Sequence, residues 1–379
     1  MKSHSREGAV VNAPEELTDG ILLKATGHFW HTAGVTTSLP KRAGCESPPP
    51  KSKAKSRPGS PGIRKQFDVL GLGCVAVDDL LFIREFPAPD SKQQVLRRER
   101  HCGGLTATAL VAASRLGACA AYAGALGDDP ESQFVLDTFA GKGVCVDHVV
   151  HRHDVRPVRS VILVEEGIGS RTILYDVTGA LGADPRRPAR DVILSARVLL
   201  VDRWGLPGMI RAAQLARRHG IPVVADLETF DLPRFEELLA LSDHLIVSEN
   251  FARQFTGARS AAAGVMRLWR DDRAVVVVTC GAQGCWWRDG QCREPRHLPA
   301  FPVKAVDTTG CGDVFHGAYA AGLARSLPVQ ECLRLASATA ALKATRPGGQ
   351  AGIPDWQTVQ RFLARARETT EPDANQDLT

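Results

Sequence analysis

The sequence predicts an α/β fold in which a mostly parallel sheet carries helices on both faces. Between residues 198 and 248, apolar runs of strand length alternate with helical segments, which is typical of parallel strands joined by helices. The runs are continuously apolar, as expected for strands that are buried on both faces. With 379 residues and 44% hydrophobic composition, the chain is long enough for one large domain or two smaller ones.

Charge is unevenly distributed along the chain. Residues 1–65 hold 11 of the 47 Lys and Arg but only 5 of the 42 Asp and Glu, and they include Pro48-Pro49-Pro50. This composition predicts a disordered basic Pro/Ser-rich extension, either a targeting or docking arm or a tail without a role. The remaining 36 basic and 37 acidic residues nearly cancel, which argues against nucleic acid as a partner. We expect one folded domain at 66–365 and a C-terminal tail at 366–379.

The cysteines and the hydropathy pattern predict a cytoplasmic protein. None of the 10 cysteines forms a Cys-x-x-Cys pair, and a chain of this size needs no disulfides, so we expect reduced thiols. No apolar run reaches the roughly 20 residues of a membrane helix. The N-terminus also lacks the pattern of a secretory signal. No membrane partner is therefore expected.

The first third of the domain predicts one buried strand and part of a small β lid. A continuous apolar run at 67–78 reads as a buried strand, whose last residue, Asp78, would lie at the ligand-binding edge of the sheet. A second strand follows instead of a helix, so Gly71 and Gly73 are weak support for a dinucleotide site. Short strands at about 80–101 begin the lid.

The segment between the lid strands reads as two helical units. Gly103 and Gly104 open a helix that ends near residue 117, and a strand–helix unit follows at 119–141. A hairpin at about 158–175 then completes the predicted lid.

Polar residues follow three predicted strands of the main sheet. They are Asp202-Arg203, Asp226-Leu227-Glu228 and Ser248-Glu249-Asn250. Carboxylates gathered at one sheet edge suit Mg²⁺, which takes few protein carboxylates together with phosphates and water. Taken singly, each of these acids is more often a helix cap or a solvated loop residue.

A glycine-rich turn follows the next predicted strand. The apolar run at 275–279 leads into Thr279-Cys280-Gly281-Ala282-Gln283-Gly284. Its glycines fit either a phosphate-binding turn or a tight hairpin. A helix at about 329–345 and the loop 346–349 complete this part of the chain.

The stretch 307–318 combines an approach for anions with a base. Its sequence is Asp-Thr-Thr-Gly-Cys-Gly-Asp-Val-Phe-His-Gly-Ala, and a helix is predicted from Val314 to Leu323. Glycines at a helix N-terminus let phosphate oxygens approach unpaired backbone N–H groups. Asp313 lies in the same turn and could accept a proton from an attacking hydroxyl. Alone, an Asp at this position is more often a helix N-cap.

The same stretch resembles the C-terminal signature of ribokinase-like (pfkB) carbohydrate kinases, and Gly103-Gly104 with the following helix resembles the N-terminal one. The resemblance covers about 66–365. It implies a ribokinase-like doubly wound sheet with a β lid that often forms a homodimer contact. It also implies ATP and Mg²⁺ as cofactors, and an alkali cation such as K⁺ beside the closing loop 346–349.

The resemblance assigns roles to individual residues. Asp313 would be the base, with an anion hole formed by the N–H groups of Gly310, Cys311, Gly312 and Asp313. The sugar would be held by Asp78, Gly103, Gly104 and Thr108. ATP would be held by Ser248, Thr279, Gly281, Gly284 and Gly349.

The sequence departs from the family pattern at several of these positions. Cys311 replaces the usual Ala and Thr108 replaces the usual Asn. Phe251 stands where the Glu of an Asn-x-x-Glu motif is expected, which leaves Glu249 as the acid near the Mg²⁺ water.

Within the family, the motifs look most like those of sulfofructose kinase and its bacterial relatives. A sulfonate-bearing ketohexose such as 6-deoxy-6-sulfofructose needs cations in the sugar pocket, and Lys92 and Arg203 match those positions. The alternative interpretation is that both are ordinary surface charges. In the lid, Tyr175 stands where this resemblance predicts an Asn. The sequence therefore predicts an ATP-dependent kinase of a sugar. The alternatives are an adenosine-type nucleoside kinase of the same fold and a sugar sensor without turnover.

Overall fold

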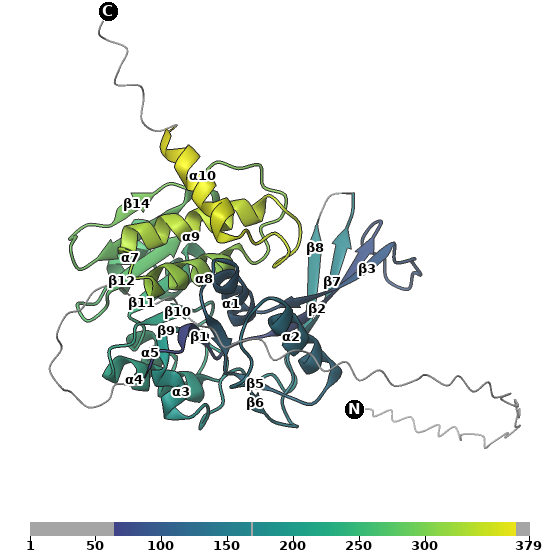
Figure 1. The fold of residues 1–379 in the computed structure, drawn as a ribbon. Coiled ribbons are helices and arrows are strands. Elements are labelled where there is room, and N and C mark those ends of the chain that lie inside the picture. Colours follow the sequence, from purple (N-terminus) through teal and green to yellow (C-terminus); the bar gives the residue numbers. More distant parts are fainter. Residues whose placement is uncertain (1–63, 168–169, 369–379) are drawn as a thin grey trace, which may run out of the picture. The chain divides into compact units, whose positions relative to one another are not determined.

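The computed structural model describes residues 64–167 and 170–368, which lie within one compact unit, Pro49–Thr379 (Figure 1). The expected disordered extension falls almost entirely outside the described residues, as do 369–379. The last described helix runs to Glu368, whereas the domain was expected to end at residue 365.

The strands and helices follow one another as the alternating pattern predicts. The strands are β1 (Phe67–Gly71), β2 (Ala76–Ile83), β3 (Arg97–Gly103), β4 (Ala120–Tyr122), β5 (Ala125–Leu126), β6 (Val150–His151), β7 (Val158–Glu165), β8 (Arg171–Asp176), β9 (Ala196–Val201), β10 (Val223–Asp226), β11 (His244–Ser248), β12 (Val275–Thr279), β13 (Cys285–Asp289) and β14 (Arg296–Leu298). The helices are α1 (Leu105–Arg115), α2 (Pro130–Gly141), α3 (Arg190–Leu194), α4 (Leu206–Arg218), α5 (Phe235–Ala240), α6 (Glu249–Thr256), α7 (Ala261–Leu268), α8 (Cys311–Ala324), α9 (Val329–Ala344) and α10 (Trp356–Glu368).

An eight-stranded sheet forms the centre of the unit, in the order β14-β13-β12-β11-β10-β9-β1-β4. Neighbouring strands are parallel along the series β12-β11-β10-β9-β1-β4. β13 pairs antiparallel with β12, and β14 pairs antiparallel with β13. Because the strands are parallel, their carboxyl ends meet at one edge, where open α/β sheets bind ligands.

Two apolar cores cover the two faces of this sheet. Val198 and Leu200 of β9 face the core formed with α1, α8 and α9, whereas Leu199 and Val201 face the core formed with α4 to α7. Alternate side chains of a strand point to opposite faces, so a strand buried on both faces must be apolar throughout. This is the physical reason why the continuous apolar runs predicted the sheet.

The predicted strand at 67–78 is wrong, because the run divides between two sheets. β1 ends at Gly71, and β2 begins at Ala76 in a separate sheet. A Cβ placed on Gly73 would lie 2.0 Å from Asp202 Oδ2, so the backbone bends tightly around that carboxylate. Asp78 therefore lies on a lid strand and not at the end of a main-sheet strand.

The lid is a four-stranded sheet in the order β3-β2-β7-β8, beside the main sheet (Figure 1). β2 pairs antiparallel with β3 and parallel with β7, which forms an antiparallel hairpin with β8. The lid expected at 80–101 and 158–175 is thus present with shifted strand ends. Residues 168–169 of the hairpin turn lie outside the described residues.

Candidate active site

A turn at the start of α8 forms the centre of the candidate site. Gly310 has φ 72° and ψ 6°, a left-handed conformation that glycine adopts without a Cβ penalty. The Cys311 N–H donates to Thr308 O at 3.1 Å, so this expected anion-hole donor is already used within the turn. The N–H groups of Gly312 and Asp313 remain in the first helical turn, where intrahelical acceptors are absent. A Cβ on Gly312 would meet nothing within 4 Å, so a ligand has access to this backbone.

Asp313 is partly exposed and lies among other acids at the carboxyl edge of the sheet. Burial raises its pKa well above the usual value, and the negative charges of Asp226 and Glu228 raise it further. The positive charge of His316 acts in the opposite direction. A carboxylate with a raised pKa binds a proton more readily, which suits it to act as a general base.

Two buried acids of the same edge are engaged in the fold. Asp202 accepts hydrogen bonds from Cys74 N, Thr106 Oγ1 and Trp204 N at 2.6, 2.9 and 2.8 Å. Asp226 Oδ2 lies 3.2 Å from His316 Nδ1. Within the described ranges, no group of three or more His, Cys, Asp or Glu side chains is placed to hold a metal ion. The structure therefore does not support the cluster of metal-binding carboxylates expected at this edge.

His316 is buried between α8 and the sheet and touches acceptors with both ring nitrogens. Nδ1 lies 2.8 Å from Gly312 O, and Nε2 lies 3.0 Å from Ile246 O. Together with Asp226 Oδ2, which lies 3.2 Å from Nδ1, these contacts fix the orientation of the ring. Through its contact with Gly312 O, His316 also fixes the peptide between Gly312 and Asp313, whose N–H points away from that carbonyl oxygen.

Asp307 ties the site turn to two other parts of the chain. Its carboxylate accepts hydrogen bonds from Thr309 N and Gly348 N, both at 2.8 Å, and pairs with Arg171 of β8 at 2.8 Å. Burial raises the pKa of Asp307, but these hydrogen bonds and the charge of Lys343 outweigh it and hold the pKa at about 2. The turn, the closing loop and the lid are therefore joined through one carboxylate.

The expected sugar residues Asp78, Gly103 and Gly104 lie together. A Cβ on Gly103 would lie 2.1 Å from Asp78 Oδ2, and one on Gly104, whose φ is 96°, would lie 2.7 Å from Cys74 O. Only glycine allows this approach. Burial raises the pKa of Asp78, and a hydrogen bond with Ser160 on β7 partly offsets that effect.

Thr108 joins this group to the turn at Gly310. Thr108 Cγ2 would lie 3.4 Å from a Cβ on Gly310, and its Oγ1 accepts a hydrogen bond from Gln350 Nε2 at 3.3 Å. The same Gly310 Cβ would lie 3.2 Å from Gly349 O. The two sequence signatures and the closing loop thus meet at one place.

Lys92 and Arg203 lie in different surroundings. Lys92 is exposed in the loop between β2 and β3. Arg203 is half-buried after β9, with its guanidinium 4.8 Å from the centre of the Trp204 ring. Arg203 Nε and Thr229 Oγ1, which follows the neighbouring strand β10, are buried without a hydrogen-bond partner in the part of the chain that the structure describes.

A cavity of about 320 Å³ lies on the other side of the turn. Thr279, Gly281 and Gly284, which sequence analysis expected at ATP, line it together with Cys311 and Gly312. Ala282, Thr308 and Phe315 also line it and belong to the stretches 279–284 and 307–318. Sequence analysis missed the remaining lining residues, which are small or apolar and give no motif: Ala300, Phe301, Pro302, Val303, Ala305, Ser337, Ala340, Ala341 and Ala344. An apolar cavity next to an anion-binding turn suits a nucleobase and its phosphates.

Ser248 and Glu249 lie outside that lining. Ser248 Oγ accepts from Phe251 N at 3.1 Å as the N-cap of α6, and Glu249 begins that helix with an exposed side chain. Mg²⁺ can be bound by one protein carboxylate together with phosphate oxygens and water, so exposed Glu249 fits such a site.

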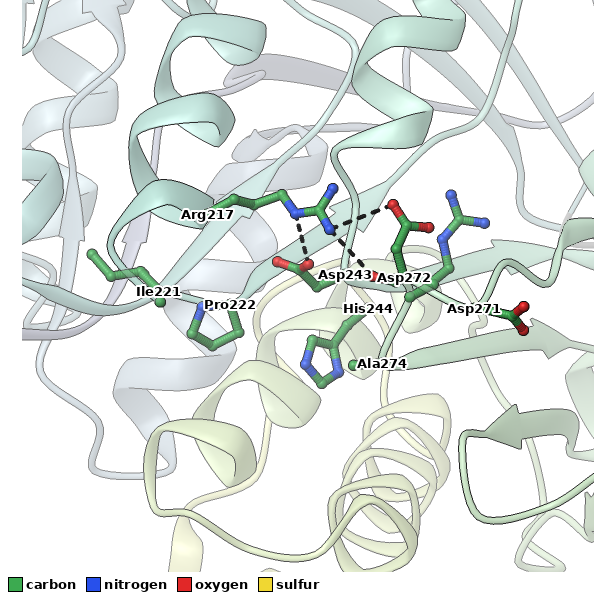
Figure 2. Close-up of a pocket in the computed structure, with 10 residues that line it drawn as sticks. Arg217, Ile221, Pro222, Asp243, His244, Asp271, Asp272 and Ala274 are labelled. Carbon is green, nitrogen blue, oxygen red and sulfur yellow. Dashed lines mark hydrogen bonds and ion pairs between the residues drawn. The ribbon is translucent and has the colours of Figure 1, made fainter.

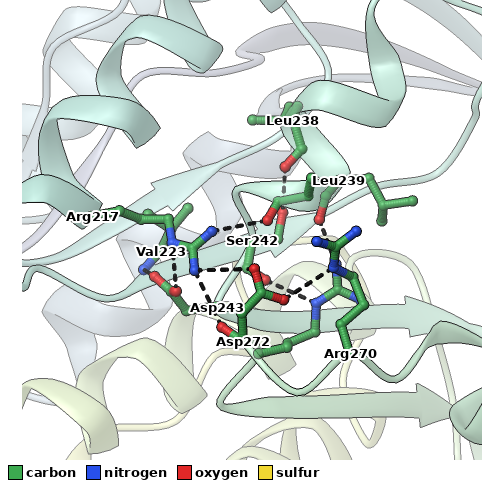
Figure 3. Close-up of polar contacts among 10 residues, drawn as sticks. Arg217, Val223, Leu238, Leu239, Ser242, Asp243, Arg270 and Asp272 are labelled. Atoms are coloured by element: carbon green, nitrogen blue, oxygen red, sulfur yellow. Dashed lines mark hydrogen bonds and ion pairs between the residues drawn. The ribbon is translucent and has the colours of Figure 1, made fainter.

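A hollow of about 480 Å³ lies at the opposite edge of the sheet, where β10, β11 and β12 begin (Figure 2). Its charged side chains are already paired. Arg217 bridges Asp243 and Asp272 (Figure 3). Buried Arg273 donates to the carbonyls of Leu239, Ser242 and Leu268. These ion pairs and hydrogen bonds connect the segments before β10, β11 and β12. The hollow lies at the sheet edge opposite to Asp313.

Comparison with known proteins agrees with this geometry. The family model "pfkB family carbohydrate kinase" matches residues 72–356. A ribokinase from Haemophilus influenzae is 28% identical over 312 residues, covering 80% of this chain and 100% of the relative. Mouse ribokinase is 31% identical over 271 residues, covering 66% and 81%. A solved protein from Agrobacterium tumefaciens assigned as a ribokinase has a TM-score of 0.74 and 26% identity, covering 79% and 98%.

The fold and the turn define a nucleotide-dependent phosphotransferase that acts on an alcohol group. The chain belongs to the pfkB family of carbohydrate kinases, and its ribokinase-like fold is confirmed. It is a sugar or nucleoside kinase of that family. None of the described helices is both long enough and apolar enough to cross a membrane.

Proposed function

We propose that the chain transfers the γ-phosphoryl group of ATP to a primary hydroxyl of a ketohexose or of its 6-sulfo derivative. One observation carries the proposal: a single turn borders both substrate regions. Cys311 and Gly312 line the nucleotide cavity, and Gly310 of the same turn neighbours Thr108. A phosphoryl group passing between the two substrates would meet this turn.

In this mechanism, the residues of the turn position and stabilise the reacting groups. Asp313 orients the sugar hydroxyl and takes its proton, while the N–H groups of Gly312 and Asp313 hold the developing negative charge. Asp78, with Gly103 and Gly104, binds other sugar hydroxyls. Bound Mg²⁺, with Glu249 near its water shell, supplies charge neutralisation for the phosphates.

Arg203 supports an anionic sugar. A buried N–H without a partner costs free energy unless a ligand accepts its hydrogen bond, and Thr229 Oγ1 has the same unmet capacity on the adjacent strand end. A sulfonate oxygen would accept from both groups, and exposed Lys92 would add a second positive charge. An uncharged ketohexose leaves Arg203 Nε without this partner.

A panel of acceptors tests the substrate. ADP release would be measured with fructose, ribose, adenosine and 6-deoxy-6-sulfofructose as acceptors. We expect the highest kcat/KM with a ketose and a larger loss for the sulfosugar than for fructose when Arg203 is replaced by Gln. Preference for adenosine would favour the nucleoside kinase alternative.

Replacing Asp313 by Asn tests the base. The variant should bind ATP normally and lose at least about 100-fold in kcat, because a positioned general base contributes factors of this size or more. Asp307 is unsuitable as a control because it supports the turn, whereas exposed Asp137 on α2 offers a neutral Asp137→Asn comparison. Substantial turnover by the Asp313 variant would refute the base role. Absence of turnover by the wild type with every acceptor would instead favour the sensor alternative.

Two relatives with other acceptors support the nucleoside kinase alternative and the ketose assignment. A nucleoside kinase from Methanothermobacter thermautotrophicus is 25% identical over 304 residues, covering 79% of this chain and 96% of the relative. Fructokinase-1 from Zea mays is 28% identical over 298 residues, covering 70% and 88%. Arg203 favours an anionic sulfosugar over both adenosine and an uncharged ketose, because neither of these carries an anionic group for it.

The lid also supports self-association. Ile173, Leu174 and Tyr175 of β8 are 55%, 58% and 70% exposed, which is unusual for neighbouring large apolar side chains. We expect a second copy of the chain to cover them. Light scattering should show a dimer that Leu174→Lys converts to monomer, and a monomeric native protein would contradict this assignment.

A further inference from the structure

Lys343 of α9 is a fully buried lysine at the active-site turn. Its exposed fraction is 0%. Nζ donates to the backbone carbonyl oxygens of Asp307, at 2.9 Å, and of Thr309. These carbonyls belong to the segment that leads directly into Gly310 and the first turn of α8.

The fold family implies an alkali cation beside the closing loop, and the residues present do not fit one. K⁺ is held in proteins by carbonyl oxygens that replace its hydration shell. Here the Asp307 and Thr309 carbonyls already receive hydrogen bonds from an ammonium group, a compact charge with three donors. The Asp307 carboxylate, bonded to Gly348 N of the closing loop, adds the matching negative charge.

Burying an ammonium group costs free energy unless other groups compensate it. Burial lowers the pKa of Lys343, while the negative charge of Asp307 acts in the opposite direction. Asp307 and Lys343 together fix the segment before Gly310. The Asp307 carboxylate accepts from Thr309 N and from Gly348 N of the closing loop, and the Lys343 ammonium group donates to the carbonyls of Asp307 and Thr309. Neighbouring Ala344 lines the cavity that we propose for the nucleotide.

We infer that the Lys343 ammonium group takes the place of the monovalent cation and makes the kinase independent of K⁺. The inference rests on the proposed function, because the turn that Lys343 holds is the one assigned to phosphoryl transfer. The covalent tether keeps the positive charge in place at any salt composition.

The first experiment compares wild-type turnover in buffers containing tetramethylammonium, Na⁺ or K⁺ as the sole monovalent cation. We expect equal kcat and KM values for ATP in all three. Activation by K⁺ of tenfold or more would overturn the inference while leaving the kinase assignment intact. Absence of turnover with every sugar and nucleoside, in K⁺ as well, would instead overturn the proposed function.

The second experiment removes the tethered charge. Lys343→Met should lose at least about 100-fold in kcat in tetramethylammonium, since small displacements of a catalytic loop have effects of this size. K⁺ or NH₄⁺ should restore activity and raise the melting temperature of this variant but not of the wild type. A folded variant that neither ion restores would overturn the inference.

Exposed Lys142 provides the matched control. Lys142→Met removes a lysine of the same size from the end of α2 and should show no response to K⁺. If Lys343→Met does not fold, Lys343→Gln keeps an uncharged NH₂ group that can donate to the carbonyls, and it should show the same rescue. A melting temperature of that variant that is insensitive to K⁺ would also count against the inference.

Discussion

Asp307→Asn should destabilise the protein by about 2 kcal/mol at neutral pH. The carboxylate pKa is held at about 2 against an ordinary value of 3.8, and a tenfold change in the acid dissociation constant corresponds to about 1.4 kcal/mol. Its side chain is 13% exposed, so solvent screening reduces this figure little. An Asn side chain would also direct an NH₂ group at one of the N–H donors that now meet oxygen.

The pH dependence of this difference follows from the direction in which the pKa moves on folding. The folded-state pKa of Asp307 is depressed, so its stabilisation is fully present above the unfolded-state value near 3.8 and is lost as pH falls through about 2. Urea unfolding at pH 7 and pH 5.5 should give the same difference between wild type and variant, and a smaller one at pH 3.

Arg171→Gln is the matched comparison for this prediction. Arg171 is 31% exposed and pairs with the same carboxylate, so its loss should cost less than about 1 kcal/mol. The two amide donors, from Thr309 and Gly348, thus account for most of the Asp307 effect. Equal losses for the two variants, or a loss below about 0.5 kcal/mol for Asp307→Asn, would refute this reasoning.

Four further variants test the site geometry. His316→Gln should move the acidic limb of the kcat/KM profile to higher pH, because it removes the positive charge that lowers the pKa of Asp313; Asp226→Asn should move that limb to lower pH. Cys311→Ala should keep most of the activity, since the thiol has no role in the proposed mechanism, and ATP should protect Cys311 from alkylation as measured by intact mass. Gly284→Ala should lower the free energy of unfolding by more than about 1 kcal/mol in urea titrations, because its φ is 90° and a Cβ would lie 2.0 Å from Leu298 O.

Sequence patterns predicted those parts of the fold whose cause is local. The strands β9 to β12 are continuous apolar runs because both of their faces are covered, and that requirement is visible in any strand taken alone. Gly310 of the turn is likewise visible, since its left-handed backbone conformation disfavours other residues.

The parts that sequence could not predict depend on contacts between distant segments. The run at 67–78 divides between two sheets because Asp202, far along the chain, occupies the space beside Gly73. Lys343 reads as a surface residue of an amphipathic helix, and only the position of the 307–309 carbonyls makes it buried. The nucleotide cavity is lined mostly by small apolar residues, a composition that is equally typical of a core.

The three acids at the carboxyl edge also show why Asp313 is the group available for chemistry. Asp202 already accepts three hydrogen bonds, and Asp226 Oδ2 lies 3.2 Å from His316 Nδ1. Among the described residues, Asp313 accepts no hydrogen bond from another side chain and keeps a partly exposed surface. Its carboxyl group therefore has acceptor capacity left for an incoming hydroxyl. The fold therefore satisfies two of its acids internally and leaves the third for an incoming hydroxyl.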